Sequence, residues 1–173
     1  MRSQEHNLIA RLIERAGDSL RAVENPKPPY RPPREKYPPL SSQHVTSAEA
    51  RLGFQLPPLL RAIYLQVSNG GFGPGYGLIG LDGGPTIYNK DLVTLYLDML
   101  EHGPPPPYRA WPKQFITICD WGCNMTSEVD WTNPDAPIFF FDGNQYDPEQ
   151  PWETAMTPEA PSFYAWLENW LNK

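Results

Sequence analysis

Proline constrains this chain more than any other residue, because 22 of its 173 residues are prolines. A proline has a fixed φ angle and no N–H, so a proline-rich segment cannot form a helix interior or a central strand. One such segment, PKPPYRPPREKYPP, covers residues 26–39. We predict that it runs as an extended, semi-rigid connector, with a spacer over the domain surface favoured over a ligand for an aromatic groove.

The connector divides the chain into residues 1–44, an N-terminal helix followed by the proline-rich segment, and a compact domain at residues 45–173. Apolar residues at helical spacing predict the first helix over residues 4–16, with Leu8, Ile9, Leu12 and Ile13 on one face. Thr46 and Glu49 have the spacing of a capping box and predict a helix that ends at Gly53. Further helices are expected after Pro57 and after Asn89 or Asp91.

Short runs rich in aromatic and β-branched residues predict strands at 115–121, 127–131 and 138–141, arranged as an antiparallel meander. Additional short strands are expected at 78–81 and near 152–156. A last helix is predicted to begin at Thr157 and Pro158, and its apolar positions are Phe163, Trp166, Leu167, Trp170 and Leu171. Helices on both sides of a run of strands indicate a single α+β domain.

Charge and composition argue against several classes of protein. The 14 Lys and Arg residues against 20 Asp and Glu residues give a net charge of −6, with no basic cluster, so direct nucleic-acid binding is not expected. No apolar run approaches the roughly 20 residues of a membrane-spanning helix, and the N-terminus lacks the apolar run of a signal peptide. Cys119 and Cys123 are too few and too close for a disulfide framework, which predicts reduced thiols and a soluble, cytoplasmic protein.

The segment AEARLGFQLPPLLRAIYLQVSNGGFGPGYGLIGL, residues 48–81, resembles the opening of SMI1/KNR4-like domains of the SUKH superfamily. The resemblance rests on Leu52-Gly53, Leu56-Pro57 and Asn69-Gly70. It continues through ITICDWGCNMTSEVDW, PIFFFDG and SFYAWLENWL, and covers about residues 45–171. It implies an α+β fold without enzymatic activity. Bacterial members look like immunity proteins that neutralise toxins, often nucleases, whereas fungal relatives are regulators that act through protein contacts.

No chemical motif in the chain is complete. GGFGPGYG, residues 70–77, lacks the Lys-Ser/Thr of a phosphate-binding loop and is expected to be a connection. The two cysteines would need two further ligands to hold zinc, and no His lies in a motif that would activate Cys123. Asp142, Asn144 and Glu153 match calcium-loop positions, but Tyr146 and Asp147 do not, so this segment is predicted to be a turn. We therefore expect no cofactor and no metal.

The predicted site is a surface that binds a protein, most simply a toxin domain, with the turn Trp121–Met125 and the acidic loop 142–149 as its main parts. Acidic residues there would attract a basic nuclease, although a solvated polar edge explains the same residues without function. The candidate residues are Phe72, Tyr76, Asp120, Trp121, Cys123, Glu128, Asp130, Asp142 and Asp147. A scaffolding or regulatory adaptor of the same fold is the alternative, and an uncharacterised hydrolase is the third hypothesis.

Overall fold

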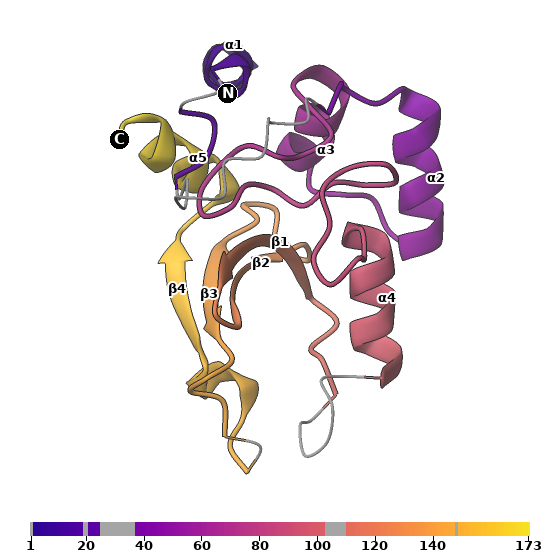
Figure 1. Ribbon diagram of the computed structural model, residues 1–173, viewed down its shortest axis with the longest axis vertical. Helices are drawn as coiled ribbons and strands as arrows, with labels where there is room; N and C mark the ends of the chain where they lie inside the picture. The colour runs from indigo at the N-terminus through magenta and orange to yellow at the C-terminus, as the bar shows by residue number, and fades with distance from the viewer. Residues whose placement is uncertain (1, 19–20, 25–36, 103–109, 148) are drawn as a thin grey trace.

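The computed structural model describes residues 2–18, 21–24, 37–102, 110–147 and 149–173 (Figure 1). Its centre is a four-stranded antiparallel sheet with the order β1-β2-β3-β4. The strands are β1 Phe115–Gly122, β2 Met125–Asp130, β3 Ile138–Asp142 and β4 Met156–Ala160. Each strand pairs with the next one along the chain. The predicted meander and the predicted α+β class are confirmed.

The helices are α1 Arg2–Gly17, α2 Ser42–Leu52, α3 Pro58–Gln66, α4 Leu92–His102 and α5 Phe163–Leu171, with a short 3-10 helix, η1, at Trp152–Thr154. Figure 1 shows α1, α3 and α5 grouped beyond one end of the sheet, while α4 lies at its side. The segment between α3 and α4 passes between these groups and runs along β1.

The sheet separates two hydrophobic clusters, because neighbouring residues of a strand point to opposite faces. On one face, Ile116 and Ile138 belong to the main core, which also includes residues of the helices. On the other face, Phe115 and Phe139 pack edge to face, with ring centroids 5.2 Å apart. This second cluster contains Trp111, Phe115, Tyr146, Trp152, Ala155 and Met156. The sheet is therefore buried on both sides.

The N-terminal helix α1 is part of the main core. Leu8, Ile9 and Leu12 are buried there, whereas Ile13 is 49% exposed, so its predicted place on the apolar face is wrong. The guanidinium of Arg15 lies over the Trp170 ring of α5, 5.0 Å from its centroid. The first and last helices of the chain thus pack together, as Figure 1 shows. Most of the predicted connector, residues 25–36, lies outside the described residues.

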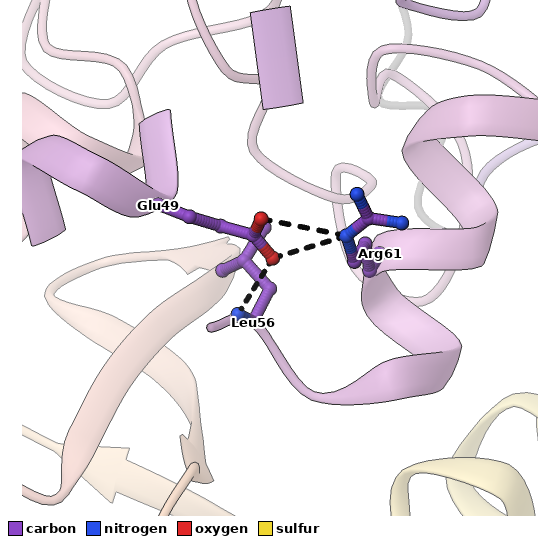
Figure 2. A network of polar contacts seen from close by, with 3 residues as sticks. All are labelled: Glu49, Leu56 and Arg61. Atoms are coloured by element: carbon purple, nitrogen blue, oxygen red, sulfur yellow. Dashed lines mark hydrogen bonds and ion pairs between the residues drawn. The ribbon is translucent and has the colours of Figure 1, made fainter. Parts of the chain in front are cut away.

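Helix α2 begins earlier than predicted, because Ser41 and not Thr46 is its N-cap; the Ser41 hydroxyl accepts from the His44 N–H at 3.4 Å. Glu49, predicted to reach back to the cap, instead points forward into the α2–α3 connection (Figure 2). Its carboxylate accepts from the Leu56 N–H at 3.1 Å and from Nε of Arg61 at 3.2 Å. The predicted capping box is wrong since the buried Leu56 N–H requires an acceptor there. Gly53 ends the helix with φ +83°, as predicted.

Three other predicted element boundaries need correction. Residues 78–81 were predicted to be a strand but form only an isolated bridge to β1, from Leu78 to Cys119. Residues 152–154 form the 3-10 helix and the fourth strand follows it. Thr157 and Pro158 lie in that strand, so α5 begins after Ser162, whose hydroxyl caps the Ala165 N–H at 3.1 Å. Asp91 caps α4 through the Thr94 N–H at 2.8 Å, in line with the prediction.

Asn69 holds the segment between α3 and α4 in place. Its Oδ1 accepts from the Leu81 N–H at 2.8 Å, and its Nδ2 donates to the Asp82 carbonyl at 3.0 Å. Gly80 lies so close to this point that an added Cβ would be 2.7 Å from the Asn69 carbonyl oxygen and 2.5 Å from the Gly84 Cα. The side chain of Asn69 therefore acts as a template for residues 80–84, which lead into one wall of the candidate site.

Candidate functional site

The turn between β1 and β2 is tight and conformationally costly. Gly122 pairs with Met125, so only two residues form the loop, and both have positive φ angles: Cys123 at +53° and Asn124 at +62°. This is the type I′ geometry that hairpins favour, but a Cys in the left-handed region costs roughly 1 kcal/mol or more. The exposed Cys123 is held there by its surroundings, since Asn144 Nδ2 donates to its carbonyl at 2.6 Å.

The loop after β3 docks against this turn. The Gly143 N–H donates to the Asn124 carbonyl at 2.9 Å, and the close approach of Asn124 leaves no room for a side chain at position 143. Asp142 closes the loop by accepting from Gln145 Nε2 at 2.6 Å and from Asn144 Nδ2 at 2.9 Å. These hydrogen bonds hold the pKa of Asp142 below its usual value, so the carboxylate is charged at neutral pH. The predicted turn is confirmed.

We call residues 120–125 and 142–147 together the hairpin-end surface. The glycine-rich loop supports it from behind: the Tyr76 N–H donates to the Asp120 carbonyl at 2.9 Å, and the Tyr76 ring lies against Gly122. Trp121 is tied inward, because its Nε1 donates to the Ser127 hydroxyl at 2.8 Å. Ser127 in turn donates to Glu159 at 2.7 Å. The surface is thus fixed to the sheet by both side-chain and backbone contacts.

The structure brings Tyr76, Asp120, Trp121, Cys123 and Asp142 together at this surface, and Asp147 follows in the same loop, where it accepts from the Glu149 N–H at 2.9 Å. Sequence proximity alone could not have joined Tyr76 to the turn, which is formed by residues more than forty positions later.

Three predicted contact residues do not belong to the surface. Phe72 is 1% exposed and packs against Trp170, so it folds onto the domain and is not available for contact with a partner. Asp130 lies at the other end of β2, where its Oδ1 accepts from the Thr132 N–H at 3.0 Å. Glu128 is fully buried on the sheet face, beside Thr117 of β1. The predicted acidic face is therefore reduced to Asp120, Asp142 and Asp147.

A pocket of about 410 Å³ adjoins the hairpin-end surface. It lies between α4, which contributes Asp98 and Met99, and the sheet, which contributes Thr117 and Thr126. Asn124 and Gly143 of the hairpin-end surface line it as well. Aromatic rings form much of the remaining wall, from Trp111, Phe141 and Trp152. This pocket was not predicted, because its walls come from segments as far apart in the sequence as Ile87 and Trp152.

Tyr88 stands at the mouth of the pocket and was missed by sequence reasoning. It is 72% exposed, and it shares a two-residue turn with Asn89, with φ angles of +53° and +61°. Ile87 and Lys90 exchange backbone hydrogen bonds of 3.0 and 2.9 Å across this turn. A tyrosine in the left-handed region is uncommon. The available signal was Asn89, which tolerates positive φ but was interpreted as a helix cap.

Glu128 lies behind the threonines on the sheet side of the pocket. Its Oε1 accepts from the Thr126 hydroxyl at 2.7 Å, and its Oε2 has no hydrogen-bond partner among the described residues. Burial raises the pKa of Glu128 to about 7, although hydrogen bonds from Thr126 and Thr117 act in the opposite direction. A carboxyl group that is only partly charged at neutral pH thus adjoins the pocket.

The two thiols have different environments, and neither is part of a metal cluster. Cys119 is buried and its thiol donates to the Pro74 carbonyl at 3.1 Å. Burial, together with the charges of Glu159 and Asp120, raises its pKa well above the usual value, so it is a poor nucleophile. Within the described ranges, no group of three or more His, Cys, Asp or Glu side chains could hold a metal ion.

None of the helices in the described part of the chain combines the length and apolar character needed to cross a membrane.

A protein-family model matches most of the chain. The model of the SMI1 / KNR4 family (SUKH-1) matches residues 39–169, which include the whole sheet, the hairpin-end surface and the pocket. No curated protein matches the chain. The family match covers the α2–α5 region, whereas α1 lies before it.

Proposed function

Because the chain belongs to the SMI1/KNR4 family (SUKH-1), we propose that it is a protein-binding immunity module that recognises one toxin domain and blocks it. The family is consistent with a protein-binding role of this kind. The observation that carries the proposal to this chain is the hairpin-end surface beside the pocket. There, separate segments held together by hydrogen bonds form a partly charged surface, and the exposed Tyr88 lines the adjoining pocket.

The features of this surface are those of a binding site. Tyr88 and Ile13 are the large hydrophobic side chains that stand exposed within the described ranges. Tyr88 is the one of these two that lines a pocket. Tyrosine is enriched among residues that dominate binding energy. Backbone strain, as in the turns at Cys123 and Tyr88, is found where the surroundings fix a functional geometry.

We propose further that the module acts without catalysis. The buried Cys119 has a raised pKa, and Cys123 lies in a strained turn where Asn144 donates to its backbone carbonyl. His44 is bonded to the Ser41 hydroxyl at 2.8 Å and His102 lies 3.4 Å from Asp98. These contacts involve two of the three histidines, and Ser41 serves as the N-cap of α2. Binding is therefore the function best supported.

The charge of the hairpin-end surface is expected to speed encounter with a basic toxin domain. Replacing Asp120 and Asp142 together by Asn removes two charges but keeps an acceptor oxygen for each turn. We expect association with the cognate toxin domain to slow about threefold to tenfold at low salt, with little change in dissociation. Stopped-flow or surface-plasmon kinetics would measure both rates.

Asp130→Asn is the matched control. Asp130 also accepts the N–H of the residue two positions later, as Asp120 does, but it lies at the far end of β2. Association should be unchanged in this variant. Equal slowing in both variants would mean that overall charge matters and this surface does not. A wild-type chain that fails to bind the toxin domain at all would rule out the immunity role.

A further inference from the structure

Glu128 lies behind the pocket wall, and its burial has no evident role in holding the fold together. It is fully buried, yet one of its carboxyl oxygens has no hydrogen-bond partner among the described residues. Burying a carboxylate without a compensating charge is costly. A buried acidic group with an unpaired oxygen is therefore a candidate for a role in binding. The family match gives no role for this position.

Glu128 is connected to the pocket through two threonines, although it does not line the pocket itself. Thr117, directly across in β1, and Thr126, two residues earlier in β2, share the sheet face of Glu128, and both line the pocket. The Thr126 hydroxyl donates to Glu128 at 2.7 Å. Its own lone pairs are then free to accept a hydrogen bond from the pocket side, so the hydroxyl can relay the carboxylate charge to a bound donor.

The other charges of the pocket cancel. Lys90 and Asp98 both line it, and they form an ion pair with each other. Glu128 is therefore the acidic group whose charge is not balanced by a side chain of the pocket. The rings of Trp111, Phe141 and Trp152 also line the pocket, and an aromatic ring attracts a desolvated cation through its face. An anion would meet both the carboxylate and the ring electrons.

We propose that this pocket receives a basic side chain, the ammonium of a Lys or the guanidinium of an Arg, presented by the protein partner. The proposal rests on the proposed function and specifies its chemistry. The volume of about 410 Å³ accommodates one long side chain. The mouth lies between Tyr88 and the hairpin-end surface, where a bound protein would already make contact. The net charge of the chain, −6, favours a basic partner.

The first experiment uses small probes and the wild-type protein. N-acetyl-arginine amide is titrated while two-dimensional NMR follows the indole N–H signals of Trp111 and Trp152. The neutral isostere N-acetyl-citrulline amide serves as the control. We expect saturable binding of the arginine probe in roughly the millimolar range, and binding of the citrulline probe at least tenfold weaker. Equal binding of the two probes, or none of either, would overturn the proposal.

The second experiment uses Glu128→Gln, which keeps the shape of the side chain and removes its charge. The preference for arginine over citrulline should disappear, and affinity for the toxin domain should fall about tenfold or more. Asp130→Asn, on the same strand and outside the pocket, should change neither. Unchanged toxin affinity in Glu128→Gln would overturn the proposal and leave the immunity role intact. Absence of toxin binding by the wild type would contradict the immunity role alone, because the probes do not involve the toxin.

Discussion

Glu128→Gln is expected to remove one contribution to the pH dependence of stability. In the wild type, the ionisation of Glu128 should lower the free energy of unfolding by about 3 kcal/mol between pH 4 and pH 8. Burial raises the pKa of Glu128 from 4.5 to about 7. The folded protein therefore keeps a proton that the unfolded chain releases as the pH rises through 4.5. The free energy of unfolding falls until about pH 7, and each pKa unit corresponds to about 1.36 kcal/mol.

Chemical denaturation at pH 4, 6 and 8 would test this expectation. At pH 4 the two proteins should have similar stability, because Glu128 is then neutral in both the folded and unfolded states. At pH 8 the variant should be the more stable by about 3 kcal/mol. Asp130→Asn provides the control for loss of an acidic residue at an exposed turn. A difference between Glu128→Gln and the wild type that stays constant with pH would show that Glu128 is not the buried acid described above.

Asn69→Ala is expected to lower the free energy of unfolding by about 3 kcal/mol. Asn69 is 3% exposed, and its side chain accepts from the Leu81 N–H and donates to the Asp82 and Leu81 carbonyls. Alanine would leave these backbone groups without partners in a buried place, and each such group costs about 1–3 kcal/mol. Relaxation of the 80–84 segment toward solvent should recover part of this cost.

Asn133→Ala is the matched control for this prediction. Asn133 also accepts a backbone N–H, that of Asp135 at 3.0 Å, but it does so at an exposed turn. Water can replace the lost acceptor there, so the cost should stay below about 1 kcal/mol. Urea denaturation of both variants would measure the difference. Equal losses would show that Asn69 is not the template for the segment between α3 and α4.

The strands of the sheet were predictable because local sequence determines them. Phe115–Gly122 and Ile138–Asp142 are short runs of β-formers bounded by turn residues, and sequence periodicity located both. The last helix was located by its apolar spacing, but its start was not. Thr157 and Pro158 resemble a helix start, yet they pair with Phe140 and Phe139 in the sheet. Tertiary pairing therefore overrode the local capping preference.

The two buried carboxylates show where local reasoning stops. Glu49 matched a capping box by spacing, but its partner is Leu56, on the far side of a loop. Glu128 lies between Ser127 and Val129 in β2, and its side chain points to the opposite face of the sheet from theirs. It was expected at the surface, because one face of the strand was expected to be exposed to solvent. Whether a strand residue is exposed depends on what covers each sheet face. Here α4 and the aromatic cluster cover the second face, which no local pattern specifies.

The candidate site was predicted in part. Trp121, Cys123 and Asp142 were selected from a turn motif and an acidic loop, and both lie at the hairpin-end surface. Tyr88 and the pocket were missed, because they arise from the way the segment before α4 folds back along the sheet. The pH-dependent cost of Glu128 and its proposed use as a cation acceptor give one account of this site: stability is given up at neutral pH for recognition.

Growth of cells that express a toxin domain would show directly whether the surface around Tyr88 binds and blocks that domain. Cells that express the cognate toxin domain are supplied with the wild-type chain, with Tyr88→Ala, or with Ile13→Ala, which removes the other exposed large hydrophobic side chain of the described residues. We expect the wild type and Ile13→Ala to restore growth and Tyr88→Ala to fail at equal expression. Protection by Tyr88→Ala equal to that of the wild type would contradict this account.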